Sequence, residues 1–153
     1  MESLGKIIKE HPFFENLIPE YIELIAGCAS LVKFDEGHMV LKEGETADNF
    51  YLVRNGKIAL QIKLPNHEAV ILDTIGEGQV VGWSWLFAPY QTHFDARALE
   101  STRAISFDGK CLRKKIDQDH NLGFHIMTQF VKIIQNRLQA TRLKLIDLYN
   151  AGK

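Results

Sequence analysis

The chain has 153 residues, a formal net charge of −1 and a hydrophobic fraction of 46%, which suits one domain with its own core. The near-zero charge provides no global field to attract nucleic acid or an anionic membrane surface. No window approaches the roughly 18 apolar residues that a membrane span needs, and the start has no signal-peptide pattern, so a cytoplasmic location is expected. Cys28 and Cys111 have neither metal-binding nor redox spacing, which predicts that both are reduced.

Two short helices are predicted at the N-terminus. Leu4, Ile7 and Ile8 lie at helical spacing, and Pro12 ends that element. Pro19 is placed to open a second helix at its first turn.

Short apolar runs separated by turn residues follow from Ser30, and they predict a β-sandwich or barrel. The predicted strands cover residues 31–34, 39–41, 50–53, 58–62, 69–72, 80–81, 94–99 and 103–107. Asn55-Gly56 between two of these runs predicts a tight hairpin of type I′, which needs positive φ at both central residues.

The last part of the chain is predicted to be helical. Asp108 can cap a short helix over 109–116, and a long helix runs over about 119–149. One apolar stripe near its start suits packing on the barrel, and a second, at heptad spacing, predicts a homodimer through this helix. The alternative is that both stripes fold back on the barrel. The first stripe is Ile126, Phe130 and Ile133; the second is Met127, Val131, Ile134, Leu138, Thr141, Leu145 and Leu148.

The ordered glycine pattern resembles the sensor domain of the catabolite-activator and Fnr family of bacterial regulators. The resemblance covers about 14–149 and rests on Asp35-Glu36-Gly37, Lys42-Glu43-Gly44, Phe50–Gly56, Gly76-Glu77-Gly78, Gly82 and the segment Asn136–Thr141. It implies a mainly β, double-stranded β-helix (jelly-roll) barrel with N-terminal helices and a long C-terminal helix. The expected regions are 1–29, 30–108 and 109–153, together one cyclic-nucleotide-binding-like domain.

The family binds its ligand in a phosphate cassette, where a glutamate accepts from the ribose hydroxyl and an arginine meets the cyclic phosphate. Gly82 and Leu86 fit this cassette, but Trp83 stands at the glutamate position and Thr92 or His93 at the arginine position. An indole N–H only donates. The loss of both charged partners, the glutamate and the arginine, weakens binding by a factor on the order of 100 to 10,000. Cyclic AMP is therefore not expected to bind in the family's usual way.

A cluster of aromatic residues lies beside the expected pocket and either walls it for a different ligand or fills and seals it: Trp83, Trp85, Phe87 and Tyr90. Ser84 either meets an anion at the helix start or simply caps that helix. Arg97 shares a strand face with Asp95, so it contacts a ligand only from a shifted position and otherwise points outward.

Three further positions have both a binding and a structural interpretation. His93 carries a positive charge at mildly acidic pH, or is an ordinary surface histidine. Thr141 reaches a ligand from the long helix, as a residue there does in the family, or sets register in a helix pair. Arg137, Arg142 and Lys144 are assigned to a solvated helix face.

The sequence carries no catalytic motif and no paired histidines of the cupin metal type, so no enzyme activity and no cofactor are expected. No residues follow the long helix to form a recognition helix, so direct DNA binding is not expected. The predicted function is a non-enzymatic sensing module for an unknown small molecule, a nucleotide or another anion. The alternative is a ligand-free dimeric interaction scaffold, and a cupin-type enzyme is the third hypothesis.

Overall fold

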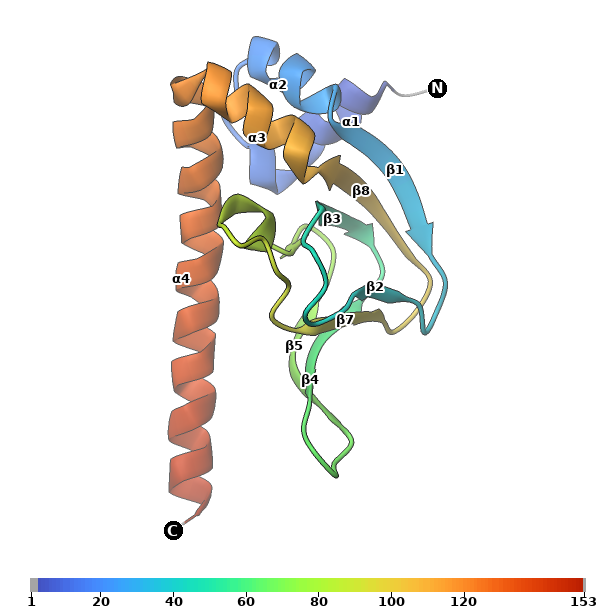
Figure 1. The fold of residues 1–153 in the computed structure, drawn as a ribbon, viewed down its shortest axis with the longest axis vertical. Coiled ribbons are helices and arrows are strands. Elements are labelled where there is room, and N and C mark those ends of the chain that lie inside the picture. Colours follow the sequence, from blue (N-terminus) through green and yellow to red (C-terminus); the bar gives the residue numbers. More distant parts are fainter. Residues whose placement is uncertain (1–2, 153) are drawn as a thin grey trace.

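Two antiparallel four-stranded sheets form the body of the computed structural model, which describes residues 3–152 (Figure 1). The strand orders are β1-β8-β3-β6 and β2-β7-β4-β5. The strands are β1 (Ala29–Phe34), β2 (Met39–Leu41), β3 (Asn49–Asn55), β4 (Ile58–Lys63), β5 (Ala69–Ile75), β6 (Val80–Val81), β7 (Asp95–Ala98) and β8 (Thr102–Asp108). The helices are α1 (Leu4–Glu10), η1 (Pro12–Phe14), α2 (Pro19–Ala26), η2 (Ser84–Leu86), α3 (Gly109–Gln118) and α4 (His120–Ala151). The predicted fold class, a mainly β jelly roll with N-terminal helices and a long C-terminal helix, is confirmed; the expected limits at residues 1 and 153 lie outside the described part.

The largest hydrophobic cluster lies where the β1-β8-β3-β6 sheet meets the helices. It combines residues from α1, η1, α2, α3 and α4 with Phe50, Leu52 and Phe107 of the sheet. A smaller cluster fills the other end of the barrel, around Ile58 and Ala96. The helical layer therefore covers one end of the barrel and leaves the β4–β5 hairpin free at the other (Figure 1).

The predicted hairpin at Asn55-Gly56 is wrong. β3 pairs with β6 and β8, whereas β4 pairs with β5 and β7, so the chain changes sheets at this point. Of the two residues of the predicted turn, only Gly56 has positive φ, at 106°. A Cβ on Gly56 would lie 2.6 Å from the Cα of Thr102, so a close backbone approach at a barrel corner, rather than a type I′ turn, requires this glycine.

The last two helices begin where the capping residues predict. Asp108 caps α3 through the Cys111 N–H, and Asp119 caps α4 through the N–H groups of Asn121 and Leu122. Ile126 and Phe130 are buried in the core and Ile133 packs against it, so the first stripe does pack on the barrel. The second stripe stays largely exposed, which excludes the alternative in which both fold back. No helix within residues 3–152 is long and apolar enough to cross a membrane.

The expectation of two reduced cysteines is wrong, because Cys28 and Cys111 form a disulfide. Cys28 directly precedes β1, which pairs with β8 so that Ala29 lies opposite Phe107. The chain then turns from β8 into α3, and this brings Cys111 back to Cys28 with a Cα–Cα distance of 5.6 Å. Strand pairing creates this proximity, so spacing along the sequence could not reveal it.

Candidate functional site

The cassette lies between β6 and β7 and faces α4, as the resemblance implies (Figure 1). Gly82 leaves β6 with φ of 93°, and a Cβ there would lie 3.5 Å from Leu41 Cδ1. The following η2 is a single turn whose first residue, Ser84, is half-buried. Trp83 precedes this turn and makes no side-chain capping bond. The structure therefore shows Ser84 inside η2 rather than capping it, and places Leu86, half-buried, against the core.

Trp85 is fully buried and belongs to the hydrophobic core. Its ring stacks on Phe50 at a centroid distance of 4.9 Å and meets Phe130 of α4 edge-on at 5.6 Å. The indole Nε1 is buried without a hydrogen-bond partner among the described residues. Of the two interpretations of the aromatic cluster, Trp85 fits the one in which the ring fills space.

Trp83 is only half-buried, and it lies beneath a cation from the long helix. The Arg137 guanidinium is 4.6 Å from the centroid of the Trp83 ring, within the range of a cation–π interaction. Phe94 meets the same ring edge-on at 6.3 Å. In this chain, a ring and a cation thus occupy the place where the resemblance puts the glutamate.

Arg137 is the residue that the sequence analysis missed, because it had been assigned to a solvated helix face. Its Nη2 donates to the carbonyl of Val80, and its Nη1 is buried with no hydrogen-bond partner in the described chain. Burial lowers the pKa of Arg137 to about 10, which the Asp73 carboxylate partly opposes, so the group stays cationic at neutral pH. The signal was available: Arg137 lies in the Asn136–Thr141 segment that carried the family resemblance.

The two residues at the family's arginine position have different environments. Thr92 is buried, and its backbone is hydrogen-bonded to the turn that follows β2: its N–H donates to the carbonyl of Glu45 at 2.9 Å and its carbonyl accepts from the Gly44 N–H at 2.8 Å. His93 is exposed. The buried residue of the two, Thr92, has no charge to offer a phosphate.

Arg97 and Thr141 lie further from the centre of the cassette. Ala96 and Ala98 are buried in the core, so the predicted alternation along β7 holds. The Asp95 carboxylate accepts from the Glu43 N–H at 2.8 Å, and Nε of Arg97 is buried with no partner in the described residues. Thr141 is exposed on α4, and its hydroxyl donates to the carbonyl of Arg137 at 2.8 Å.

A groove of about 450 Å³ separates α4 from the β5–β6 turn and η1, a volume typical of small-molecule sites. Charged groups lie on both of its sides, with Arg137 and Lys132 on α4 and Asp73 on β5. Apolar side chains supply the rest of the walls, among them Phe13, Val80 and Ile133. The remaining lining residues are Pro12, Gly78, Gln79, Gln129, Asn136 and Ala140.

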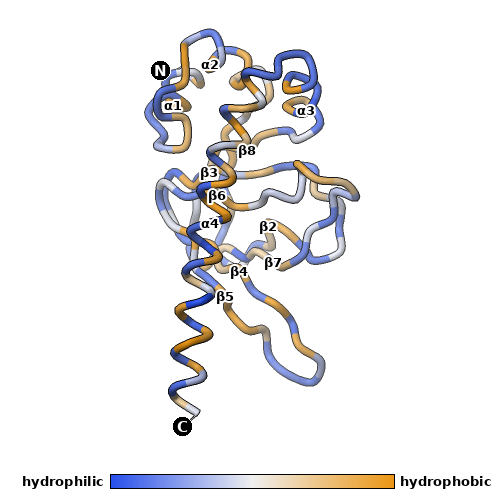
Figure 2. The backbone as a smooth tube through the Cα atoms, turned by 90° about the vertical axis from the view of Figure 1, so that its left-hand side faces the viewer, coloured by the Kyte–Doolittle hydropathy of each residue, from blue (hydrophilic) through white to orange (hydrophobic). Residues whose placement is uncertain are grey.

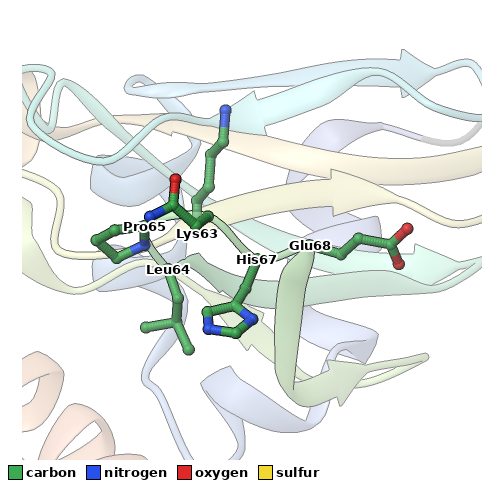
Figure 3. Close-up of a pocket in the computed structure, with 6 residues that line it drawn as sticks. Lys63, Leu64, Pro65, His67 and Glu68 are labelled. Carbon is green, nitrogen blue, oxygen red and sulfur yellow. The ribbon is translucent and has the colours of Figure 1, made fainter.

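A larger hollow of about 590 Å³ lies in the turn between β4 and β5. It is formed only by the consecutive residues 63–68, and Figure 3 shows the Lys63 and Glu68 side chains pointing away from each other. Because no second element closes this hollow, it is not a candidate binding site. Within residues 3–152, no group of three or more His, Cys, Asp or Glu side chains is arranged to hold a metal ion.

A jelly roll that carries a short cassette between β6 and β7, with a long helix across it, defines a class of ligand-sensing domains. Residues 31–119 match the family model for the cyclic nucleotide-binding domain, so the chain belongs to this family. The resemblance to the catabolite-activator and Fnr type is thereby confirmed.

Individual relatives agree with this assignment. A CRP-like cAMP-activated global transcriptional regulator from Mycobacterium tuberculosis is 26% identical over 145 residues, which are 95% of this chain and 63% of the relative. The chain thus spans less than two thirds of that regulator. A crystal structure described as a cyclic nucleotide-binding protein from Geobacter metallireducens superposes with a TM-score of 0.80 at 27% identity, over 90% of this chain and 99% of that one. The Thermus thermophilus catabolite activator protein shares the fold, with a TM-score of 0.70 at 22% identity over 90% of this chain and 63% of that one.

Proposed function

We propose that this chain is a non-enzymatic sensing module of the cytoplasm that binds a small anion in the groove between α4 and the β5–β6 turn. The observation that carries the proposal is the environment of Arg137, a half-buried cation whose Nη1 is buried without a hydrogen-bond partner in the described chain, at the edge of this groove.

The charges and the walls of the groove favour an anion with an apolar part. Arg137 and Lys132 outnumber Asp73 among the lining residues, so the groove has a net positive charge. A buried donor without an acceptor costs roughly 1–3 kcal/mol, and a rotation of the Arg137 side chain that brings Nη1 to an anionic oxygen in the groove would remove that cost. Phe13 and Ile133 offer apolar surface for the rest of the ligand.

Cyclic AMP in the family's usual mode is disfavoured by the same contacts. The resemblance puts a ribose-binding glutamate at Trp83, but the indole only donates a hydrogen bond and its face is covered by Arg137. The phosphate-binding arginine position is filled by Thr92 or His93. A different anion, bound beside Arg137 rather than inside the cassette, is consistent with both substitutions.

Binding would be transmitted through α4. The helix lines the groove with Arg137 and continues to Ala151, past the end of the barrel (Figure 1). A ligand that binds one orientation of α4 more tightly than another shifts the population toward that orientation. The outer half of the helix then moves, which alters the surface available to a partner.

Isothermal titration with cyclic AMP, cyclic GMP and cyclic di-GMP, followed by a thermal-shift screen of nucleoside phosphates and aromatic carboxylates, tests this function. The proposal expects a stabilising anion whose effect is lost in Arg137→Gln and kept in Arg142→Gln, since Arg142 is exposed on the same helix. Micromolar cyclic AMP binding would overturn our interpretation of the cassette. A melting temperature that no anion shifts would favour the scaffold.

The second candidate function is a dimeric interaction scaffold, favoured by the exposed apolar stripe on α4. Val131, Leu138, Leu145 and Leu148 expose between 51% and 72% of their surface, and Figure 2 shows the hydrophobic segments along the outer half of the helix. Their heptad spacing suits a second copy of the same helix. Sedimentation equilibrium of the double variant Leu145→Gln/Leu148→Gln should show dissociation, with Leu31→Gln on β1 as the exposed apolar control.

A further inference from the structure

The disulfide joins the start of β1 to α3, the helix that packs against the cassette. Cys28 lies between α2 and β1, and Cys111 lies in the first turn of α3, at a sequence separation of 83. These are the only two cysteines of the chain, so no internal thiol is present to exchange with the bond. Any change in its state has to come from a thiol or disulfide in solution.

The bond is open to small molecules on one side. A hollow of about 340 Å³ lies over it, lined by the two cysteines, by Gly27, Ala29 and Ser30, by the polar side chains of Asn49 and Ser106, and by the carboxylate of Asp108. Cys28 is buried, at 7% exposure, whereas Cys111 is half-buried. A thiolate that enters the hollow would therefore meet the Cys111 sulfur first.

The helix that carries Cys111 also holds the cassette. Two residues later, Arg113 donates from Nη1 to the carbonyl of Trp85 at 2.5 Å, and its guanidinium lies 4.1 Å from the ring centroid of Tyr90. At the start of the same helix, a Cβ on Gly109 would be 3.0 Å from Trp85 Cβ. Any displacement of the first turns of α3 is thus transmitted directly to η2 and the loop that follows it.

Contacts other than the disulfide also hold α3. Lys115 Nζ donates to the carbonyl of Leu24 at 2.5 Å, and the Asp108 N–H donates to the carbonyl of Cys28 at 2.9 Å. The fold is therefore expected to survive reduction, with the first turns of α3 less constrained. A redox switch requires this combination, in which the fold is kept while the helix that packs against the cassette becomes less constrained.

We propose that Cys28–Cys111 is a reversible thiol–disulfide exchange site for low-molecular-weight thiols of the glutathione class, and that reduction loosens the cassette through Arg113. This goes beyond the proposed anion site but rests on the proposed cytoplasmic location, where a disulfide in a protein is typically transient or redox-sensing.

The exchange proceeds in two balanced steps. A glutathione thiolate attacks Cys111 Sγ, forms a mixed disulfide there and releases the Cys28 thiolate, which takes up a proton. A second glutathione thiolate attacks the glutathione sulfur of the mixed disulfide and releases the Cys111 thiolate, which is also protonated. Two glutathione thiols are oxidised to glutathione disulfide, while the protein disulfide is reduced to two thiols.

The test equilibrates the full chain in glutathione buffers of varied redox ratio and counts free thiols by alkylation and mass spectrometry. Trp emission and hydrogen exchange over residues 82–94 are followed in the same samples, and the melting temperature of the reduced protein is expected to fall by roughly 5–15 °C. The double variant Cys28→Ser/Cys111→Ser should behave like the reduced protein at every ratio.

Arg113→Gln should become reduced at the same ratio as the wild type but should show a smaller change in the cassette, whereas Lys114→Gln, exposed one residue later, should respond like the wild type. Three outcomes would overturn the inference: a bond that excess glutathione cannot reduce in the folded protein, thiols that glutathione disulfide cannot oxidise, or a complete redox cycle that leaves residues 82–94 unchanged. Each outcome concerns the disulfide alone, so it is distinguishable from failure of the anion proposal.

Discussion

The guanidinium of Arg137 covers the indole ring of Trp83, so a cation–π contact joins the long helix to the cassette beyond the point where Phe130 packs on Trp85. The contact replaces, in this chain, the acidic residue that the family resemblance puts at position 83. It makes the position of α4 dependent on a ring that is itself only half-buried.

Trp83→Ala should lower the free energy of unfolding by about 1–3 kcal/mol, because it removes both the cation–π interaction and the buried part of the ring. Trp83→Phe keeps an aromatic face under Arg137 and should lose less than half as much. Urea denaturation of both variants measures the difference. Equal losses in the two variants would show that the interaction with the cation contributes nothing beyond surface burial.

Trp85→Ala should be far more destabilising, by about 3–5 kcal/mol, because a fully buried ring stacked on Phe50 leaves a cavity that the core cannot refill. Phe87→Ala is the matched control from the same loop; its ring is 49% exposed, so its effect should stay within about 0.5 kcal/mol. Equilibrium unfolding measures both losses, and a larger loss in Phe87→Ala than in Trp85→Ala would contradict the prediction.

Stability should fall in mild acid because of His11. The Phe13 N–H donates to Nδ1 at 3.2 Å, so the proton lies on Nε2, which faces the carbonyl of Val53 at 3.3 Å. Burial lowers the pKa of His11 below its ordinary value of 6.5, with the Val53 bond opposing this shift. The unfolded chain therefore binds a proton at a pH where the folded protein does not.

This linkage gives full stability above pH 6.5 and a loss as the pH falls below 6.5 toward the folded-state pKa, by at most about 1.4 kcal/mol per pH unit for one proton. His11→Gln cannot titrate and should flatten the curve of melting temperature against pH. His67→Gln, exposed in the β4–β5 turn, should leave the curve as it is in the wild type. A wild-type curve that is already flat would contradict the prediction.

Gly56→Ala should cost about 2–5 kcal/mol, since positive φ is strained for any L side chain and the new methyl group would collide with Thr102. Gly37→Ala separates the two effects. Gly37 also has positive φ, at 87°, but nothing lies within 4 Å of its Cβ position, so its loss should be only about 1–2 kcal/mol. Chemical denaturation measures both losses. Equal stability of the two alanine variants would show that the contact with Thr102 adds no cost.

Local chemistry made much of the fold predictable. Asp108 and Pro19 mark helix starts in the sequence, and glycines mark the strand ends, because capping and positive φ depend on neighbouring residues alone. The position of the cassette after Gly82 was implied by the family resemblance that the glycine pattern carries. The observed fold class and order of elements agree with the prediction made from these features.

The errors arose where distant segments meet. The Asn55-Gly56 turn connects two sheets, and local sequence does not specify which strands will pair. The partnership of Cys28 with Cys111 depends on the β1–β8 ladder. Arginine is usually a solvated residue, and the contacts that partly bury Arg137, with Trp83 and the carbonyl of Val80, come from segments distant in sequence. Tertiary contacts, rather than propensity, decided all three.

The uneven burial along α4 has a consequence for its dynamics. Its first turns are anchored by buried residues such as Leu122 and Phe130, whereas its last turns, around Leu145 and Leu148, have little packing to support them. A single isolated copy should therefore unwind from its C-terminal end, with the fastest amide exchange of the helix there. If a second copy covers these turns, the helical content of the solution rises with protein concentration, and circular dichroism across a dilution series would register assembly as a change in secondary structure.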